Sequence, residues 1–308
     1  GLGVQRYFLT AGLDELKTAL GLLQRLAGSV PIKLAVPASF QGQLSGIAGL
    51  KVLPVPERYP DSHWRLILAK ACGTGNITYE GARQAGHYFL TAEHLCLALR
   101  AVKAGLPRTT KLVTVAGKGL GQPALVETPL GTPVGHLLEE LGIMVAEGDR
   151  VILGGVWQGE AQFDRNSPVT LGTDGVTVIA ADELTHLKDN PCIHCGRCVS
   201  ICPVNIQVGL VARYAEFALV DEAYTLGAHA CIECGCCAYV CPAQRPLLQY
   251  MRYAIEQYEA AQAAAEEAGA EPAASTAAQE WDVKTEAVAA PQEAPLKDGQ
   301  SAGKGGTK

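Results

Sequence analysis

Two cysteine runs constrain this chain more than any other feature. Residues 192–203 have the sequence CIHCGRCVSICP and residues 231–242 have CIECGCCAYVCP, so both follow the spacing Cys-x2-Cys-x2-Cys-x3-Cys-Pro. This spacing is typical of proteins with two [4Fe–4S] clusters, in which the fourth cysteine of each run ligates the other cluster. The proline after each run lacks an N–H and fixes φ, so it redirects the chain after the last ligand. The runs predict a module that transfers electrons.

The spacing also assigns the cysteines to two ligand sets. Three cysteines two residues apart can hold three corners of one cubane, while the fourth leaves on the far side of the turn. We expect one cluster on Cys192, Cys195, Cys198 and Cys241, and the other on Cys231, Cys234, Cys237 and Cys202.

Other roles for the cysteines fit less well. A structural zinc site needs four ligands and would leave the third and fourth cysteine of each run unexplained. A disulfide framework suits small secreted domains, whereas this chain has 308 residues and no signal-peptide pattern. Cys236 lies off the spacing, and Cys72 and Cys96 stand alone, so we assign these three no chemistry.

Composition sets the outer limits. With 48% hydrophobic residues and a net charge of −6, the chain can build two or three domains, and nothing indicates a nucleic-acid partner. No apolar run approaches the roughly 18 to 20 residues that cross a bilayer, so we expect membrane association only through a partner. Many free thiols and no export signal favour the cytoplasm. The chain begins with Gly1 and not with Met, which fits either a processed or a truncated N-terminus.

Residues 1–110 alternate strand-like and helix-like segments. Short apolar runs predict strands at 5–11, 32–38 and 50–56. Amphipathic patterns predict helices at 13–28 and 91–105. This region is therefore predicted to be an α/β domain.

Residues 111–180 are predicted to form a small β-grasp-like unit. Runs rich in Val, Ile and Thr, bounded by glycine, predict strands at 111–117, 150–156 and 175–181. The segment 133–142, with leucines at helical spacing and a closing glycine, predicts a short helix between the first two.

Residues 181–258 are predicted to be an α-helical ferredoxin module. One helix should bridge the two runs, because Leu210, Val211, Tyr214, Phe217 and Ala218 recur at three- and four-residue spacing. A second helix should follow the second run.

Residues 259–308 are rich in Ala, Glu, Pro and Gly and are predicted to be a disordered tail. Its early part, EAAQAAAEEA, has high helix propensity and can extend the preceding helix. The alternative is a tether for a partner, anchored by Trp281 and Val283.

The order of these segments resembles the RnfC family, which belongs to the Rnf complex, a membrane-bound, ion-translocating ferredoxin:NAD oxidoreductase. The likeness covers residues 1–258, is strongest from Lys111 onward, and rests on ERYPDSHWRLI, KLVTVAGKGL, LGTPVGHLLEELG, RVILGGVWQG and the two cysteine runs. It implies that residues 1–110 are similar to the NADH- and FMN-binding subunit of respiratory complex I. It also implies a soluble-ligand-binding β-grasp (SLBB) domain at 111–180 and two [4Fe–4S] clusters on the same eight cysteines.

This chain departs from the family pattern where a nucleotide would bind. The family's Tyr-Pro-Gln-Gly-Gly-like stretch is here Tyr59 to His63, without its glycines, and residues 154–159 replace a Gly-Gly-Pro-Met-Met-Gly-like turn. FMN and NADH belong to the family's cofactors, but we carry over no residue for either and name no catalytic residue.

The resemblance implies an electron-transfer subunit of a membrane-associated oxidoreductase complex. Its partners would be the other subunits and a ferredoxin or flavoprotein, and its place the cytoplasmic face of the inner membrane. The isolated chain would carry electrons without completing the enzyme reaction. Two alternatives stay open: a cobalamin reductase of the propanediol-utilisation type, and a non-catalytic scaffold with structural metal.

Overall fold

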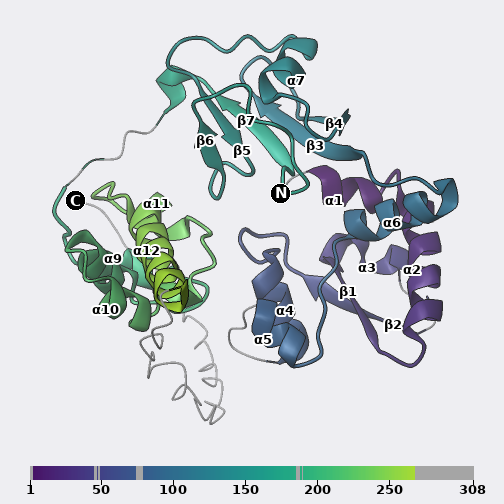
Figure 1. Cartoon of the computed structure of the whole chain (residues 1–308), viewed down its shortest axis with the longest axis horizontal. Helices are drawn as coiled ribbons and strands as arrows, with labels where there is room; N and C mark the ends of the chain where they lie inside the picture. Colours follow the sequence, from purple (N-terminus) through teal and green to yellow (C-terminus); the bar gives the residue numbers. More distant parts are fainter. Residues whose placement is uncertain are drawn as a thin grey trace, which may run out of the picture.

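The computed structural model describes residues 3–267 except 45–46, 48, 74–78, 185–187 and 189. It has three parts: an N-terminal α/β part, a β-sheet part and a helical part that contains both cysteine runs (Figure 1). The predicted mixed α/β class is confirmed.

The N-terminal part packs helices beside a two-stranded parallel sheet, β1 (Ile32–Pro37) with β2 (Leu50–Val55). Its helices are α1 (Gly3–Phe8), α2 (Leu13–Ala27), α3 (Gln41–Leu44), α4 (Trp64–Cys72), α5 (Tyr79–Gln84) and α6 (Ala92–Ala104). The segments predicted as helices at 13–28 and 91–105 and as strands at 32–38 and 50–56 are confirmed.

The strand predicted at 5–11 is wrong, because this segment begins in α1. Val4 and Phe8 are both fully buried, in one core cluster with Leu16 of α2. Phe8 lies four positions after Val4, a spacing that places both on one face of a helix. Burial of this helical stripe outweighs the strand preference of the short apolar run.

The middle part is a five-stranded sheet in the order β4-β3-β7-β5-β6, with α7 (Val134–Glu140) packed on its valine-rich core. The strands are β3 (Thr110–Gly117), β4 (Ala124–Pro129), β5 (Arg150–Leu153), β6 (Glu160–Gln162) and β7 (Gly175–Ile179). β3 and β7 are parallel, and the other pairs are antiparallel. The three predicted strands and the helix are present, whereas β4 and β6 were not predicted.

A buried ion cluster ties the sheet to the N-terminal part. Lys111 of β3 and Glu93 of α6 are each 1% exposed, and Lys111 Nζ lies 2.5 Å from Glu93 and 2.7 Å from Asp174. Arg108 also donates to Glu93, at 3.2 Å. A buried carboxylate needs such partners. The ion cluster therefore holds α6 in place against β3.

The helical part contains α8 (Arg197–Ser200), α9 (Val208–Glu216), α10 (Val220–Thr225), α11 (Cys236–Tyr239) and α12 (Leu247–Glu267). The single bridging helix is wrong: Ala218 has a φ of 56°, which ends the first helix, and α10 follows. Val211 is fully buried as predicted, but Leu210 and Phe217 are 45% and 63% exposed. The buried face of α9 consists of Val208, Val211, Ala212 and Ala215.

The two cysteine runs share one backbone conformation. α8 and α11 occupy the same place within their runs, and α9 and α12 begin at the same distance from the first cysteine of each run. The positive φ angles also pair: His194 53° with Glu233 54°, Gly196 73° with Gly235 73°, and Asn205 57° with Gln244 54°. The helical part is therefore an internal structural repeat.

α12 continues past Tyr258 to Glu267, into the segment predicted to be a tail. Residues 268–308, including Trp281 and Val283, lie outside the described residues. Among the helices of the described part, none has the length and apolar character needed to cross a membrane.

Candidate iron–sulfur sites

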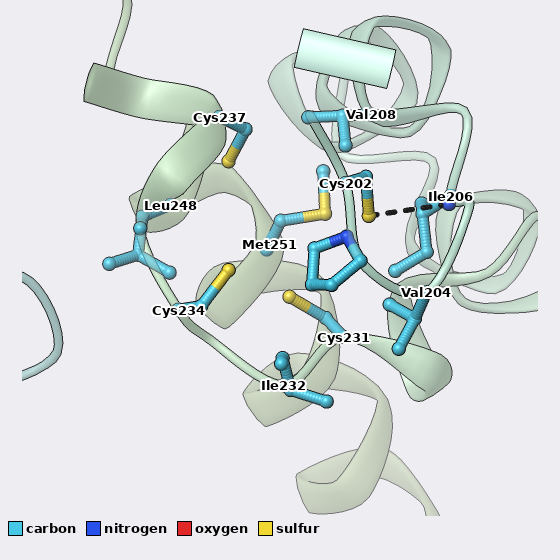
Figure 2. Close-up of a pocket in the computed structure, with 12 residues that line it drawn as sticks. Cys202, Val204, Ile206, Val208, Cys231, Ile232, Cys234, Cys237, Leu248 and Met251 are labelled. Atoms are coloured by element: carbon cyan, nitrogen blue, oxygen red, sulfur yellow. Dashed lines mark hydrogen bonds between the residues drawn. The ribbon is translucent and has the colours of Figure 1, made fainter. Parts of the chain in front are cut away.

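Four cysteine sulfurs surround one cavity in the helical part. Figure 2 shows Cys202, Cys231, Cys234 and Cys237 directing their sulfurs into a common space. Its other walls are mainly apolar and include Val204, Ile206, Val208, Ile232, Leu248 and Met251. We call it the second-run cavity, because three of its cysteines belong to the second run.

A matching cavity lies at the first run. Its lining includes Cys192, Cys195, Cys198 and Cys241, together with Ile193, Gly209, Leu247 and the side chain of Arg245. We call it the first-run cavity.

The fourth cysteine of each run crosses to the cavity of the other run. The structure thus brings together the two sets of four cysteines that the spacing predicts. Cys236 is buried but lines neither cavity, while Cys72 and Cys96 lie in α4 and α6. Within the described residues, no three His, Cys, Asp or Glu side chains are grouped to hold a single metal ion.

Backbone N–H groups point at several of these sulfurs. His194 N lies 3.4 Å from Cys192 Sγ, and Glu233 N lies 3.3 Å from Cys231 Sγ, at equivalent places in the repeat. Ile206 N donates to Cys202 Sγ at 3.4 Å. Hydrogen bonds to sulfur stabilise negative charge and are one means by which proteins set cluster potentials.

Burial alone would keep the thiols protonated. Desolvation raises the pKa of Cys231 and of Cys237 to about 12 and also raises the pKa of Cys198. A bound metal ion reverses this preference, because it binds the thiolate directly and displaces the proton. Four thiols around an apolar cavity, with N–H donors to sulfur, therefore fit the ligand requirements of a [4Fe–4S] cluster.

The two runs differ in how far the rest of the chain covers them. Ile193 of the first run is 64% exposed, whereas Ile232, its equivalent in the second run, is 4% exposed. Cys195 is exposed, and its equivalent Cys234 is buried. The second run is covered because Leu66 of α4 packs against Ile232 and Cys234.

Two side chains of the N-terminal part donate to the backbone of the second run. Tyr59 Oη lies 2.6 Å from the carbonyl oxygen of Cys234, and Arg65 Nη1 lies 2.7 Å from that of Cys231. The α4 helix that carries Arg65 is capped by His63, whose Nδ1 accepts from Arg65 N at 3.3 Å. Burial and the nearby Arg65 lower the pKa of His63 to about 4, so this cap is neutral at pH 7.

The turn between β5 and β6 contacts the second run from another side. The Trp157 ring lies between Tyr59 and Tyr239, with centroid distances of 5.6 and 4.3 Å. Arg252 of α12 donates to Gln158 O and to Glu233 Oε2, both at 2.7 Å. Sequence reasoning missed this junction, because no local pattern links residues so distant along the chain.

The hydrogen bond from Tyr59 gives a test of this junction. We expect Tyr59→Phe to lower the free energy of unfolding by about 1 to 3 kcal/mol, since it leaves the Cys234 carbonyl without a donor while keeping the ring contact with Trp157. Urea unfolding would measure the change. Tyr239→Phe is the control, because Tyr239 is 73% exposed. Equal effects of the two substitutions would contradict this role of Tyr59.

Comparison with known proteins agrees with this geometry. The family model of the 4Fe-4S dicluster domain matches residues 185–266. The C subunit of the ion-translocating oxidoreductase complex of Rhodobacter capsulatus is 28% identical over 204 residues, which are 63% of this chain and 39% of the relative.

Two further relatives have similar names. The C subunit of the Na(+)-translocating ferredoxin:NAD(+) oxidoreductase complex of Acetobacterium woodii is 31% identical over 67% of this chain and 46% of its own length. The C subunit of the ion-translocating oxidoreductase complex of Methanosarcina acetivorans is 38% identical over 50% of this chain and 34% of its own length. The chain thus spans less than half the length of these relatives. The resemblance found in the sequence is confirmed, and the dicluster match supports iron–sulfur clusters.

Proposed function

We propose that this chain, an RnfC-like iron–sulfur protein, relays electrons through two [4Fe–4S] clusters. The electrons would pass between a nicotinamide or ferredoxin couple and redox partners at the membrane. The observation that carries this proposal is the pair of four-sulfur cavities, each completed by a cysteine from the other run.

The residues around each cavity bind and shield the cluster. Cys192, Cys195, Cys198 and Cys241 would hold one cluster, and Cys202, Cys231, Cys234 and Cys237 the other. The clusters supply one-electron transfer when bound. Apolar walls exclude water, and the N–H groups of His194, Ile206 and Glu233 stabilise charge on the ligand sulfurs.

The unequal cover of the two runs supports an order for the relay. The second-run cluster would lie next to Tyr59, Arg65 and Trp157, and so face the other two parts of the chain. The first-run cluster would lie beside exposed Ile193 and Cys195, where a separate protein can approach. Electrons would therefore pass between the covered cluster and a partner through the exposed cluster.

The remaining assignments form part of the same proposal. Residues 1–110 would be an incomplete relative of the flavin-binding part of complex I, and residues 111–180 an SLBB domain. The chain would associate with the membrane at its cytoplasmic face through other subunits. No residue is assigned to NADH or FMN, so a separate flavin or nicotinamide site would exchange electrons with the clusters.

An anaerobic reductive titration tests the relay. We expect dithionite to bleach the cluster absorption of the reconstituted full chain, with one electron taken up for each cluster. NADH alone should leave the absorption unchanged, and NADH with an added flavoprotein reductase should bleach it. Bleaching by NADH alone would contradict the proposal that this chain lacks a working nicotinamide site.

A further inference from the structure

The internal repeat allows the walls of the two cavities to be compared position by position. The fourth residue after Cys202 is Ile206, and the fourth residue after Cys241 is Arg245. Each residue is 4% exposed and each lines a cavity, Ile206 the second-run cavity and Arg245 the first-run cavity. One repeat thus places an aliphatic side chain where the other places a guanidinium.

Arg245 has an unused donor in this buried position. Its Nη2 donates to Glu216 Oε2 at 2.6 Å, and its guanidinium carbon lies 5.4 Å from the centroid of the Tyr250 ring. Its Nε, however, is buried with no hydrogen-bond partner among the residues that the structure describes. A buried donor on a charged group is costly to leave unpaired, so this N–H indicates an acceptor that belongs in the cavity.

The acceptor that fits is the negatively charged cluster of the proposed function. Thiolate-bound clusters carry negative charge and accept hydrogen bonds at their sulfurs. An arginine has no acceptor of its own and stays protonated, so it acts on its surroundings only as a cation and a donor. Reduction adds one further negative charge to the cavity. A buried cation stabilises that charge strongly, because the surroundings screen it poorly.

We propose that Arg245 raises the reduction potential of the first-run cluster above that of the second-run cluster. This inference rests on the proposed function, since it requires a cluster in each cavity. The consequence would be a preferred direction of transfer: oxidation of the covered cluster and reduction of the exposed cluster would be favourable. The repeat would then bias electrons towards the cluster at the surface.

The second run also has a cation beside it, but this cation acts from outside the cavity. Arg65 contacts the second run through the Cys231 carbonyl and does not line the second-run cavity. Glu233, in the same run, is paired with Arg252 and adds a carboxylate on that side. Glu216, the partner of Arg245, is 35% exposed, so water screens its charge more than that of the 5% exposed Arg245 side chain.

Potentiometric titration of the reconstituted full chain, followed by EPR, tests the proposal. Arg245→Ile copies the wall of the other cavity. We expect it to shift the electron equilibrium between the clusters at least tenfold towards the second-run cluster, which corresponds to about 59 mV for one electron. The shifted signal should be the one that is absent from Cys195→Ala, and the other potential should stay unchanged. Arg245→Lys keeps the charge, so it should lower the potential of the first-run cluster less than Arg245→Ile does.

Glu216→Gln is the matched control, because it removes the ion pair and keeps the cation. It should leave the potential of the first-run cluster unchanged or raise it. A fall as large as that of Arg245→Ile would overturn the proposal, since the ion pair would then act only structurally. Unchanged potentials in an Arg245→Ile protein with both clusters would also overturn it. If unaltered protein binds no clusters, the proposed function fails instead.

Discussion

Cys202→Ala is expected to abolish the cluster of the second run, although Cys202 belongs to the first run. Cys202 Sγ lines the second-run cavity with Cys231, Cys234 and Cys237. Removing one of four ligands leaves an iron without its thiolate. Iron content should fall by about half, and the EPR spectrum should match that of Cys234→Ala.

Two control variants show whether the loss is specific to the second-run cluster. Cys195→Ala should remove the other cluster, so its spectrum should differ from that of Cys202→Ala. Cys236→Ala should keep both clusters, because Cys236 is buried within the second run but lines neither cavity. A spectrum of Cys202→Ala that matches Cys195→Ala would show that each run holds its own cluster.

Gly235→Ala should destabilise the protein far more than Gly196→Ala, although the two glycines are equivalent in the repeat. Both have a φ of 73°, so each substitution carries the left-handed strain of about 1 to 2 kcal/mol. A Cβ on Gly196 would meet nothing within 4 Å, whereas a Cβ on Gly235 would lie 2.6 Å from the Trp157 carbonyl oxygen. The backbone of the turn must then move, at a further cost of about 1 to 3 kcal/mol.

Urea unfolding of the reconstituted proteins would measure both changes. Trp157 fluorescence, recorded in a Trp64→Phe, Trp281→Phe background, would be a local probe of the junction. We expect the Gly235 variant to show altered Trp157 emission before unfolding, and the Gly196 variant to keep the emission of the unaltered protein. Equal losses of stability, with unchanged emission in both variants, would mean that the turn between β5 and β6 does not support the second run.

The cysteine sets could be predicted because their spacing is a local property. The spacing places three sulfurs on one turn, and the crossing of Cys202 and Cys241 follows from the two-cluster pattern. The mixed α/β class and most elements also followed from local patterns. The short apolar runs at 32–38 and 50–56 became β1 and β2.

The remaining features depend on contacts between distant residues. α1 is helical because Val4 and Phe8 meet a core that the first residues alone do not reveal. α9 ends where Ala218 adopts a left-handed conformation, and composition gives no sign of this. The role proposed for Arg245 depends on its position in a cavity wall and on its equivalence with Ile206, which the sequence pattern does not reveal.

The most direct test of the central claim is the metal content of the full chain after anaerobic reconstitution, measured together with EPR of the reduced protein. Two clusters predict about eight iron and eight sulfide per chain and two interacting EPR signals. About four iron with a single signal, or zinc in place of iron, would contradict the account.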